Sequence, residues 1–78
     1  HIFRERVSDL KSTYPQLTDL DMKEVILIGL GVPTQDILTF TDMSKRTYYK
    51  RRQLIAKRMD TTAAQLDTII IPLFNNSL

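Results

Sequence analysis

The chain of 78 residues has no cysteine and no tryptophan, and it contains only two glycines and three prolines. The absence of cysteine excludes a disulfide scaffold and thiolate metal sites, and it fits a reducing compartment. The longest apolar stretches, 25–30 and 69–74, are far shorter than the roughly 20 residues of a membrane-spanning helix. With 42% hydrophobic and 26% charged residues, the composition is that of one globular domain with room for three to five short helices.

Residue types that carry out catalysis are scarce as well. The only histidine, His1, stands at the amino end and can be left from a purification tag. Asp19, Asp21 and Glu24 lie near the start of a predicted helix, where the helix dipole accounts for acids. The stretch 29–31 holds both glycines but lacks the further glycines of a phosphate-binding loop. We therefore expect no enzyme activity, no metal and no cofactor.

Acidic residues are missing from 44–59, where seven of the eleven Lys and Arg residues lie. Because the whole chain carries a net charge of only +2, this run is a local positive field whose natural partner is a polyanion. Ser44 can act as N-cap and no Gly or Pro interrupts the run, which predicts one helix over 45–59. The seven basic residues are Lys45, Arg46, Lys50, Arg51, Arg52, Lys57 and Arg58.

Successive residues lie about 100° apart around a helix, which divides the basic run into faces. One face can pack on the core and consists of Tyr48, Ile55 and Met59, with Ala56 and Arg52 at its margin. The opposite face would meet the base edges of a major groove, and its members are Arg46, Tyr49, Lys50, Gln53 and Lys57. The flanks suit DNA phosphate contacts, and they carry Lys45, Arg51, Arg52 and Arg58.

Other interpretations of the run follow from the same residues. A solvated helix face would alternate Glu and Lys, and the run contains no acid. A helix lying on an anionic membrane would insert Trp or Phe, and this apolar face has neither. A protein-interaction module that binds an acidic partner is the alternative from a different class. Gln53 can pair with adenine or be an ordinary exposed helix former, and the sequence leaves both open.

The amino-terminal segment has the apolar spacing of a helix, which should end before Pro15. The stripe consists of Phe3, Val7, Leu10 and Tyr14. It fits a helix that packs on its own domain, or the tail of a coiled coil that enters from upstream. Because the helical pattern begins at once after His1, we expect this sequence to be a piece of a longer protein.

A capping box formed by Thr18 and Asp21 predicts a second helix over 19–29. Its apolar positions nearly surround it, so we expect it at the centre of the core. Gly29 and Gly31 are expected to stop this helix, since glycine accepts the left-handed conformation.

Thr34 is expected to cap a short third helix over 35–40. Its inward face would be Ile37 with Leu38 or Phe40. The three-residue link 41–43 would then lead into the basic helix, so that two helices are joined by a tight turn.

Thr62 and Gln65 have the spacing of another capping box and predict a last helix. Pro72 should terminate it, because the proline ring removes a backbone donor. Leu73 and Phe74 would fold back or meet a partner, and 75–78 would be a fraying tail. The apolar stripe of this helix is Ala63, Leu66, Ile69 and Ile70.

Several short motifs follow one another between residues 17 and 70. They are Leu17–Thr18, Leu30–Gly31–Val32, Gln35–Asp36–Ile37, Met43–Ser44–Lys45–Arg46–Thr47–Tyr48, and then Ile55, Lys57, Arg58 and Met59. Together they resemble the LuxR/GerE type of helix-turn-helix domain, which lies at the carboxy end of bacterial transcription regulators. The chain departs from that family at Leu38, where a small residue is usual, and at Thr41, where an apolar residue is usual.

The resemblance implies an all-α fold, a four-helix helix-turn-helix bundle over 17–74 that follows a linker helix over 1–16 and precedes a tail over 75–78. It implies that the recognition helix 45–59 lies in the major groove with Tyr49, Lys50 and Gln53 facing the bases. Thr34 and Gln35, at the start of the scaffold helix, would bind phosphates.

In this family the last helix often dimerises. Leu66, Ile69 and Ile70 are therefore candidates for a homodimer interface as well as for the core, and the amino-terminal helix offers a second route to a dimer. The opening segment 3–18 further resembles the subset in which a sensor domain of helical repeats, a membrane segment and a helical linker precede the DNA-binding domain.

We therefore expect sequence-specific binding of double-stranded DNA by the output domain of a bacterial transcription regulator, as a dimer. Its location would be the cytoplasm, or the cytoplasmic end of a membrane-anchored regulator. The alternatives are a protein-interaction or dimerisation module with a basic helix, and a sigma-factor-like promoter-binding domain.

Overall fold

The computed structural model describes residues 2–75, with side chains for 4–74. Within this part of the chain there are five α-helices, one short 3-10 helix and no strand, so the predicted all-α fold class is confirmed. The helices are α1 (Ile2–Thr13), α2 (Asp19–Gly29), α3 (Thr34–Thr41), α4 (Lys45–Arg58) and α5 (Leu66–Asn75), with the 3-10 helix η1 (Ala63–Gln65) before α5. Two predictions fall outside this description, the side chain of Phe3 and the tail beyond Asn75.

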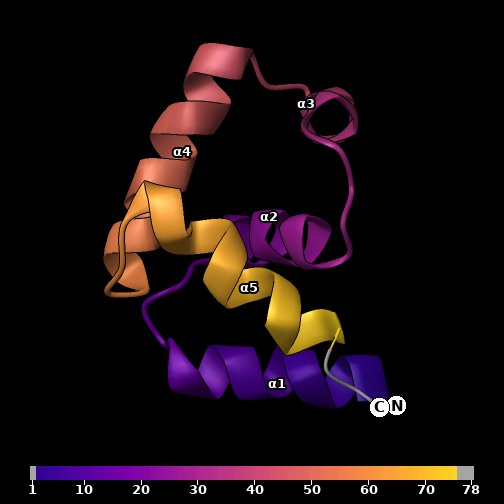
Figure 1. Cartoon of the computed structure of the whole chain (residues 1–78), viewed down its shortest axis with the longest axis vertical. Coiled ribbons are helices and arrows are strands. Elements are labelled where there is room, and N and C mark those ends of the chain that lie inside the picture. Colours follow the sequence, from indigo (N-terminus) through magenta and orange to yellow (C-terminus); the bar gives the residue numbers. More distant parts are fainter. Residues whose placement is uncertain (1, 76–78) are drawn as a thin grey trace.

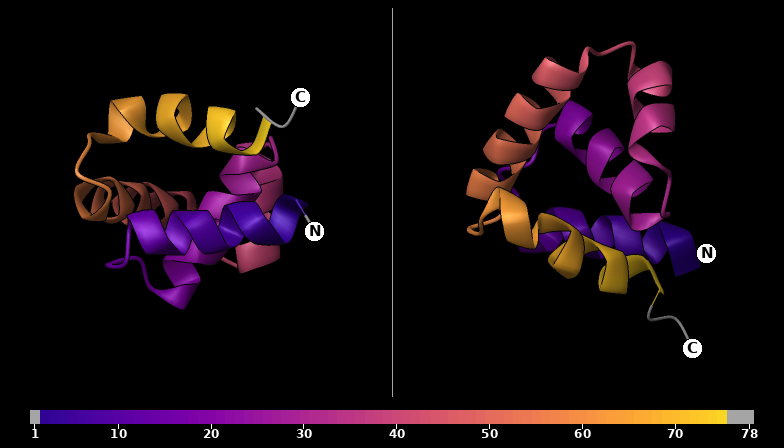
Figure 2. Two further views of the ribbon diagram at one scale, coloured as in Figure 1. Left: turned by 90° about the horizontal axis from the view of Figure 1, so that it is seen from below. Right: turned by 45° about the horizontal axis from the view of Figure 1, so that its top comes forward.

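The helices are arranged around α2 and α5, which pack together at the centre (Figure 1). α1 lies along α5, and the start of α1 and the end of α5 are on the same side of the molecule (Figure 1). α3 and α4 project from this platform and meet at the turn 42–44, the part of the ribbon farthest from α1 (Figures 1 and 2). The arrangement places α4 with one long side free of other helices.

The core contains buried apolar side chains from all five helices. Leu10 of α1 is among them with 4% exposure, and Val7 and Tyr14 pack against its edge. The first helix therefore packs on its own domain, as one of the two sequence interpretations predicted. The buried apolar set is Leu10, Leu17, Met22, Val25, Ile28, Ile37, Tyr48, Ile55, Ala56, Met59, Leu66 and Ile70.

The predicted capping box at the start of α2 is present. The Thr18 hydroxyl accepts from the Asp21 N–H at 3.1 Å, and the Thr18 N–H donates to Asp21 Oδ2 at 3.0 Å. Gly31 ends this region as predicted, because its φ of 78° lies in the left-handed region and lets the Val32 N–H reach the Leu27 carbonyl at 3.1 Å.

α2 ends at Gly29, the predicted boundary, and Gly29 is buried as the last residue of the helix. A Cβ atom at this position would stand 2.1 Å from Cδ2 of Phe74, so glycine here makes room for the Phe74 ring. Phe74 is accordingly half-buried and packs at the edge of the core as part of α5, so the predicted fold-back of the chain after Pro72 does not occur.

The prediction that Thr34 caps α3 was also wrong. Pro33 occupies the N-cap position with no side-chain cap bond, and Thr34 is already the first helical residue. Because the Pro33 ring fixes φ, at −60°, the chain is preorganised for a first turn in which the Pro33 carbonyl accepts from the Ile37 N–H at 3.0 Å. Ile37 faces the core, whereas Phe40 is 69% exposed.

The turn after α3 begins one residue later than predicted and comprises 42–44. Asp42 adopts the left-handed conformation, with φ of 55°, and its N–H reaches the Leu38 carbonyl. Ser44 then starts α4 as expected, since its hydroxyl accepts from the Thr47 N–H at 3.1 Å. Leu38 is half-buried at this side of the core.

Two predictions about the last helix were wrong. Thr62 makes no side-chain cap bond, so no capping box with Gln65 forms, and α5 begins only at Leu66 after the short η1. Pro72 lies inside α5 rather than ending it. The missing proline N–H costs only one helical hydrogen bond, to the Thr68 carbonyl. Packing of Phe74 against α2 favours continuation of the helix to Asn75.

Candidate nucleic-acid interface

The inner face of α4 is the apolar face that the sequence predicted. Tyr48, Ile55 and Ala56 are each 1% exposed, and Met59 just beyond the helix is 3% exposed. Arg52 lies at the margin of this face and is half-buried. α4 is thus fixed on the core from Tyr48 to its end.

The opposite face of α4 is exposed to solvent. All five residues predicted to face DNA bases lie on it, and the structure brings them together along one side of one helix. Tyr49 packs edge-on against the buried Tyr48, with ring centroids 5.5 Å apart, which fixes the root of an otherwise exposed ring. The five exposed residues are Arg46, Tyr49, Lys50, Gln53 and Lys57.

Positive charge on this side is not neutralised by the protein. None of the four exposed cations of α4 forms an ion pair with a carboxylate of the described residues. Their charges therefore act outward on solvent and on any polyanion nearby. The four cations are Lys45, Arg46, Lys50 and Lys57.

Two arginines on the flank of α4 are bound to carboxylates of α2. Arg51 donates from Nε to Glu24 Oε2 at 2.8 Å and from Nη2 to Asp21 Oδ1. Arg58, two turns further along α4, donates from Nη1 to Asp21 Oδ2 at 2.5 Å. Asp21 and Glu24 are both completely buried. These four side chains, which we call the α2–α4 clamp, fix one helix against the other.

The clamp shifts the pKa values of Asp21 and Arg51. Burial by itself raises the pKa of Asp21, but hydrogen bonds from the Thr18 N–H, Arg58 and Arg51 outweigh it, so the pKa of Asp21 lies below its usual value. For Arg51, burial lowers the pKa, and the interactions with Glu24 and Asp21 outweigh it and raise the pKa. The charged forms on both sides of the clamp are therefore favoured.

The third flanking arginine, Arg52, is bound to α5. It donates to Asp67 Oδ1 at 3.0 Å and to the Tyr48 hydroxyl at 3.3 Å, and its guanidinium lies 5.8 Å from the Tyr48 ring centroid. Burial lowers the pKa of Arg52, and these two partners outweigh it and raise the pKa. Each flanking arginine thus binds a carboxylate of the protein itself. Phosphate contact by Arg51, Arg52 and Arg58 remains a prediction, and it would require each arginine to bind a DNA phosphate in addition to its carboxylate.

The predicted phosphate ligands of α3 lie at its beginning. Thr34 and Gln35 are both exposed there. A hollow of about 210 Å³ separates this end of α3 from α4 and α5, with Thr34, Tyr48 and Arg52 among its lining residues. The start of α3 and the flank of α4 therefore border one surface.

The acids of the clamp were not recognised as site residues in the sequence, where the helix dipole accounted for them. A signal was nevertheless present. Asp21 and Glu24 precede Val25 and Ile28 at helical spacing, so the acids lie in phase with the apolar stripe of α2 rather than opposite it. Charges on a buried stripe need partners of opposite charge, and the basic run supplied them.

The candidate dimer residues of α5 separate into two groups. Leu66 and Ile70 are fully buried in the core of this chain, which accounts for both of them without a second copy. Ile69 is half-buried and packs against the core. A dimer contact on α5 would have to use more exposed residues, such as Ile71 and Leu73.

None of the helices formed by residues 2–75 is both long enough and apolar enough to cross a bilayer. Comparison of the chain with known protein families, with curated proteins and with solved structures gave no match.

Proposed function

We propose that this chain binds double-stranded DNA sequence-specifically through α4, as the output domain of a bacterial transcription regulator of the LuxR/GerE type. The observation that carries the proposal is the exposed side of α4, which presents Tyr49, Gln53 and four cations that have no acidic partner among the described residues. Arginine, lysine and glutamine on one helix face are the residue types that read base edges in a major groove.

The surroundings of α4 support this role. α3 and α4 are joined by a three-residue turn, the connection of a helix-turn-helix unit in which the second helix enters the groove. α4 has 14 residues and is thus about 21 Å long, enough to lie along the groove. The start of α3 would then meet the phosphate backbone with Thr34 and Gln35.

The clamp favours reading of sequence over loose attraction to a polyanion. Because α2 fixes α4 through Asp21 and Glu24, the exposed face does not have to be ordered when DNA binds. A preorganised face loses less conformational entropy on binding and keeps its side chains in register with the base pairs. A dimer would read two half-sites about one helical turn apart.

Base reading is tested by Lys50→Ala and Gln53→Ala in a binding selection on random duplex DNA, followed by titration of the selected site. Each substitution should weaken binding to that site by about 1–3 kcal/mol and relax the choice at one position. Lys23→Ala and Gln16→Ala are matched controls, since both residues are exposed and lie outside α4. Equal loss on all DNA sequences would assign Lys50 and Gln53 to phosphates and refute base reading.

A protein-interaction module is the second candidate, and exposed apolar side chains near α3 favour it. Leu30 and Phe40 are 56% and 69% exposed. Under this alternative, the wild-type chain produces no gel shift with duplex DNA. Phe40→Ser would then abolish binding to an acidic partner protein. Under the DNA-binding proposal, Phe40→Ser retains the gel shift.

A further inference from the structure

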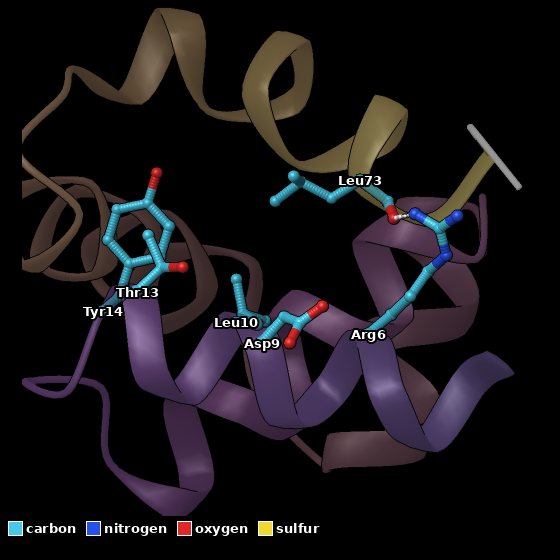
Figure 3. Close-up of a pocket in the computed structure, with 6 residues that line it drawn as sticks. All are labelled: Arg6, Asp9, Leu10, Thr13, Tyr14 and Leu73. Atoms are coloured by element: carbon cyan, nitrogen blue, oxygen red, sulfur yellow. Dashed lines mark hydrogen bonds between the residues drawn. The ribbon is translucent and has the colours of Figure 1, made fainter. Parts of the chain in front are cut away.

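α1 is attached to the rest of the chain by two cationic side chains that donate to main-chain carbonyl oxygens. Arg6 donates to the Leu73 carbonyl of α5 at 2.6 Å, as Figure 3 shows, and Lys11 donates to the Leu17 carbonyl at 2.5 Å. Between these two bonds only Leu10 is fully buried. A cavity of about 130 Å³ beside Leu10 separates this side of α1 from Leu73 (Figure 3). α1 is therefore held by the packing of Val7, Leu10 and Tyr14 together with these two hydrogen bonds.

The bond from Lys11 ends on a peptide group that has a second charged partner. The carbonyl of the Leu17–Thr18 peptide accepts from Lys11, and the N–H of the same peptide donates to the carboxylate of Asp21 at 3.0 Å. A cation on the oxygen and an anion on the N–H polarise the peptide in the same direction, so each bond strengthens the other. The position of Lys11 thus affects the carboxylate of Asp21.

Asp21 carries this connection on to α4. Its Oδ2 accepts from the Thr18 N–H and from Arg58, and its Oδ1 accepts from Arg51. The Asp21 side chain is 0% exposed, whereas the side chains of Arg51 and Arg58 are 17% and 29% exposed, so solvent screens these bonds less than it would at the surface. A continuous hydrogen-bonded route therefore runs from α1, through one peptide and one carboxylate, to two arginines on the flank of the helix with the DNA-binding face.

We propose that this route makes the seating of α1 a regulator of DNA affinity. With α1 seated, Lys11 fixes the Leu17–Thr18 peptide and Asp21 in the orientation that fixes α4. When α1 is displaced, the route opens at Lys11, α4 becomes less firmly held on α2, and DNA binding weakens. A sensor domain ahead of α1 would act on the DNA-binding face in this way. The inference rests on the proposed function and adds its regulation.

Lys11→Met tests the first link, because methionine keeps the apolar stem and removes the donor. Lys23→Met is the matched control, an equal loss of charge at an exposed lysine of α2 whose side chain has no hydrogen bond or ion pair with the described residues. Dissociation constants for one labelled duplex, measured by fluorescence anisotropy at fixed salt, should rise about three- to tenfold more for Lys11→Met than for Lys23→Met. Lys11→Arg retains a donor and should restore the wild-type affinity. Equal effects of Lys11→Met and Lys23→Met would overturn the inference.

A double substitution tests whether Lys11 and Arg58 belong to one route. If they do, Lys11→Met combined with Arg58→Gln weakens binding by less than the product of the two single fold-changes. Lys23→Met combined with Arg58→Gln should give the full product. A full product for the Lys11 pair would show that the two residues act separately and would overturn the inference.

Hydrogen exchange in the free protein tests the route without DNA. Lys11→Met should speed exchange of the Thr18 amide and of amides in α4, whereas Lys23→Met should leave both at the wild-type rate. Unchanged exchange in α4 would overturn the inference even if DNA binding is intact. If wild-type protein binds no DNA and exchange in α4 still responds to Lys11, the proposed function is wrong while the structural connection holds.

Discussion

Asp21 connects the start of α2 with α4 through one buried carboxylate. Its carboxylate completes the cap of α2 and accepts from two arginines of α4, although the side chain has no exposed surface. A buried carboxylate without partners would be strongly unfavourable, so the position is stable only because all its bonds form together. Removal of the charge from Asp21 should therefore affect the start of α2 and the seating of α4 at once.

The pH dependence of stability should report this residue. Because the pKa of Asp21 is lowered from 3.8, its contribution is fully present above about pH 5 and is lost as the pH falls through 3.8 towards the lower pKa of the folded state. Asp21→Asn should lower the free energy of unfolding by about 3 kcal/mol at pH 7. Urea titrations should show that the difference in free energy of unfolding between the wild type and Asp21→Asn becomes smaller below pH 4. Asp36→Asn is the control for the loss of an exposed carboxylate. A difference of equal size at pH 3 and pH 7 would contradict the assignment.

Gly29 is a second residue whose identity the fold restricts, because a side chain there would meet Phe74. Since a Cβ atom would stand 2.1 Å from the Phe74 ring, Gly29→Ala should displace that ring and lower the free energy of unfolding by about 1–3 kcal/mol. In a thermodynamic cycle of urea titrations, Gly29→Ala should cost much less when Phe74 is already alanine. If Gly29→Ala lowers the free energy of unfolding by the same amount in the Phe74→Ala variant, the Phe74 ring is not the reason that glycine is required at position 29.

At the scale of elements, local signals predicted the starts of helices where a side chain alone decides them. Thr18 and Ser44 cap α2 and α4 as predicted, because each hydroxyl meets an N–H within its own turn. Thr62 has the same spacing to Gln65 and forms no cap bond. The spacing of a capping motif in the sequence thus does not ensure that the cap hydrogen bond forms, because the backbone conformation before the helix also has to allow it.

The elements that the sequence mispredicted are those set by contacts between distant residues. Pro72 has a strong local tendency to end a helix, yet it lies within α5, whose continuation places Phe74 against Gly29. No local pattern contains that contact, which joins residues 45 positions apart. The two faces of α4 were predictable, since helical spacing alone assigns them, whereas the partners of Arg51 and Arg58 required the position of α2.

At the scale of the whole molecule, the arrangement separates two uses of positive charge. The seven cations of the basic run divide into three arginines that bind the protein's own carboxylates and four cations that face solvent. The arginines fix α4 on α2 and α5, so the remaining cations are presented by a helix whose orientation is set before DNA arrives. Charge on the flank positions the helix, and charge on the outer face supplies attraction.

The salt dependence of DNA binding tests this division most directly. If the four exposed cations together release the counterions of about four phosphates, log K should fall against log salt with a slope of about −3.6 per chain, or about −7 for a dimer. Replacing Lys45, Arg46, Lys50 and Lys57 together by glutamine should bring that slope close to zero. A slope near zero for the wild-type chain, or an unchanged slope after the fourfold replacement, would contradict the account.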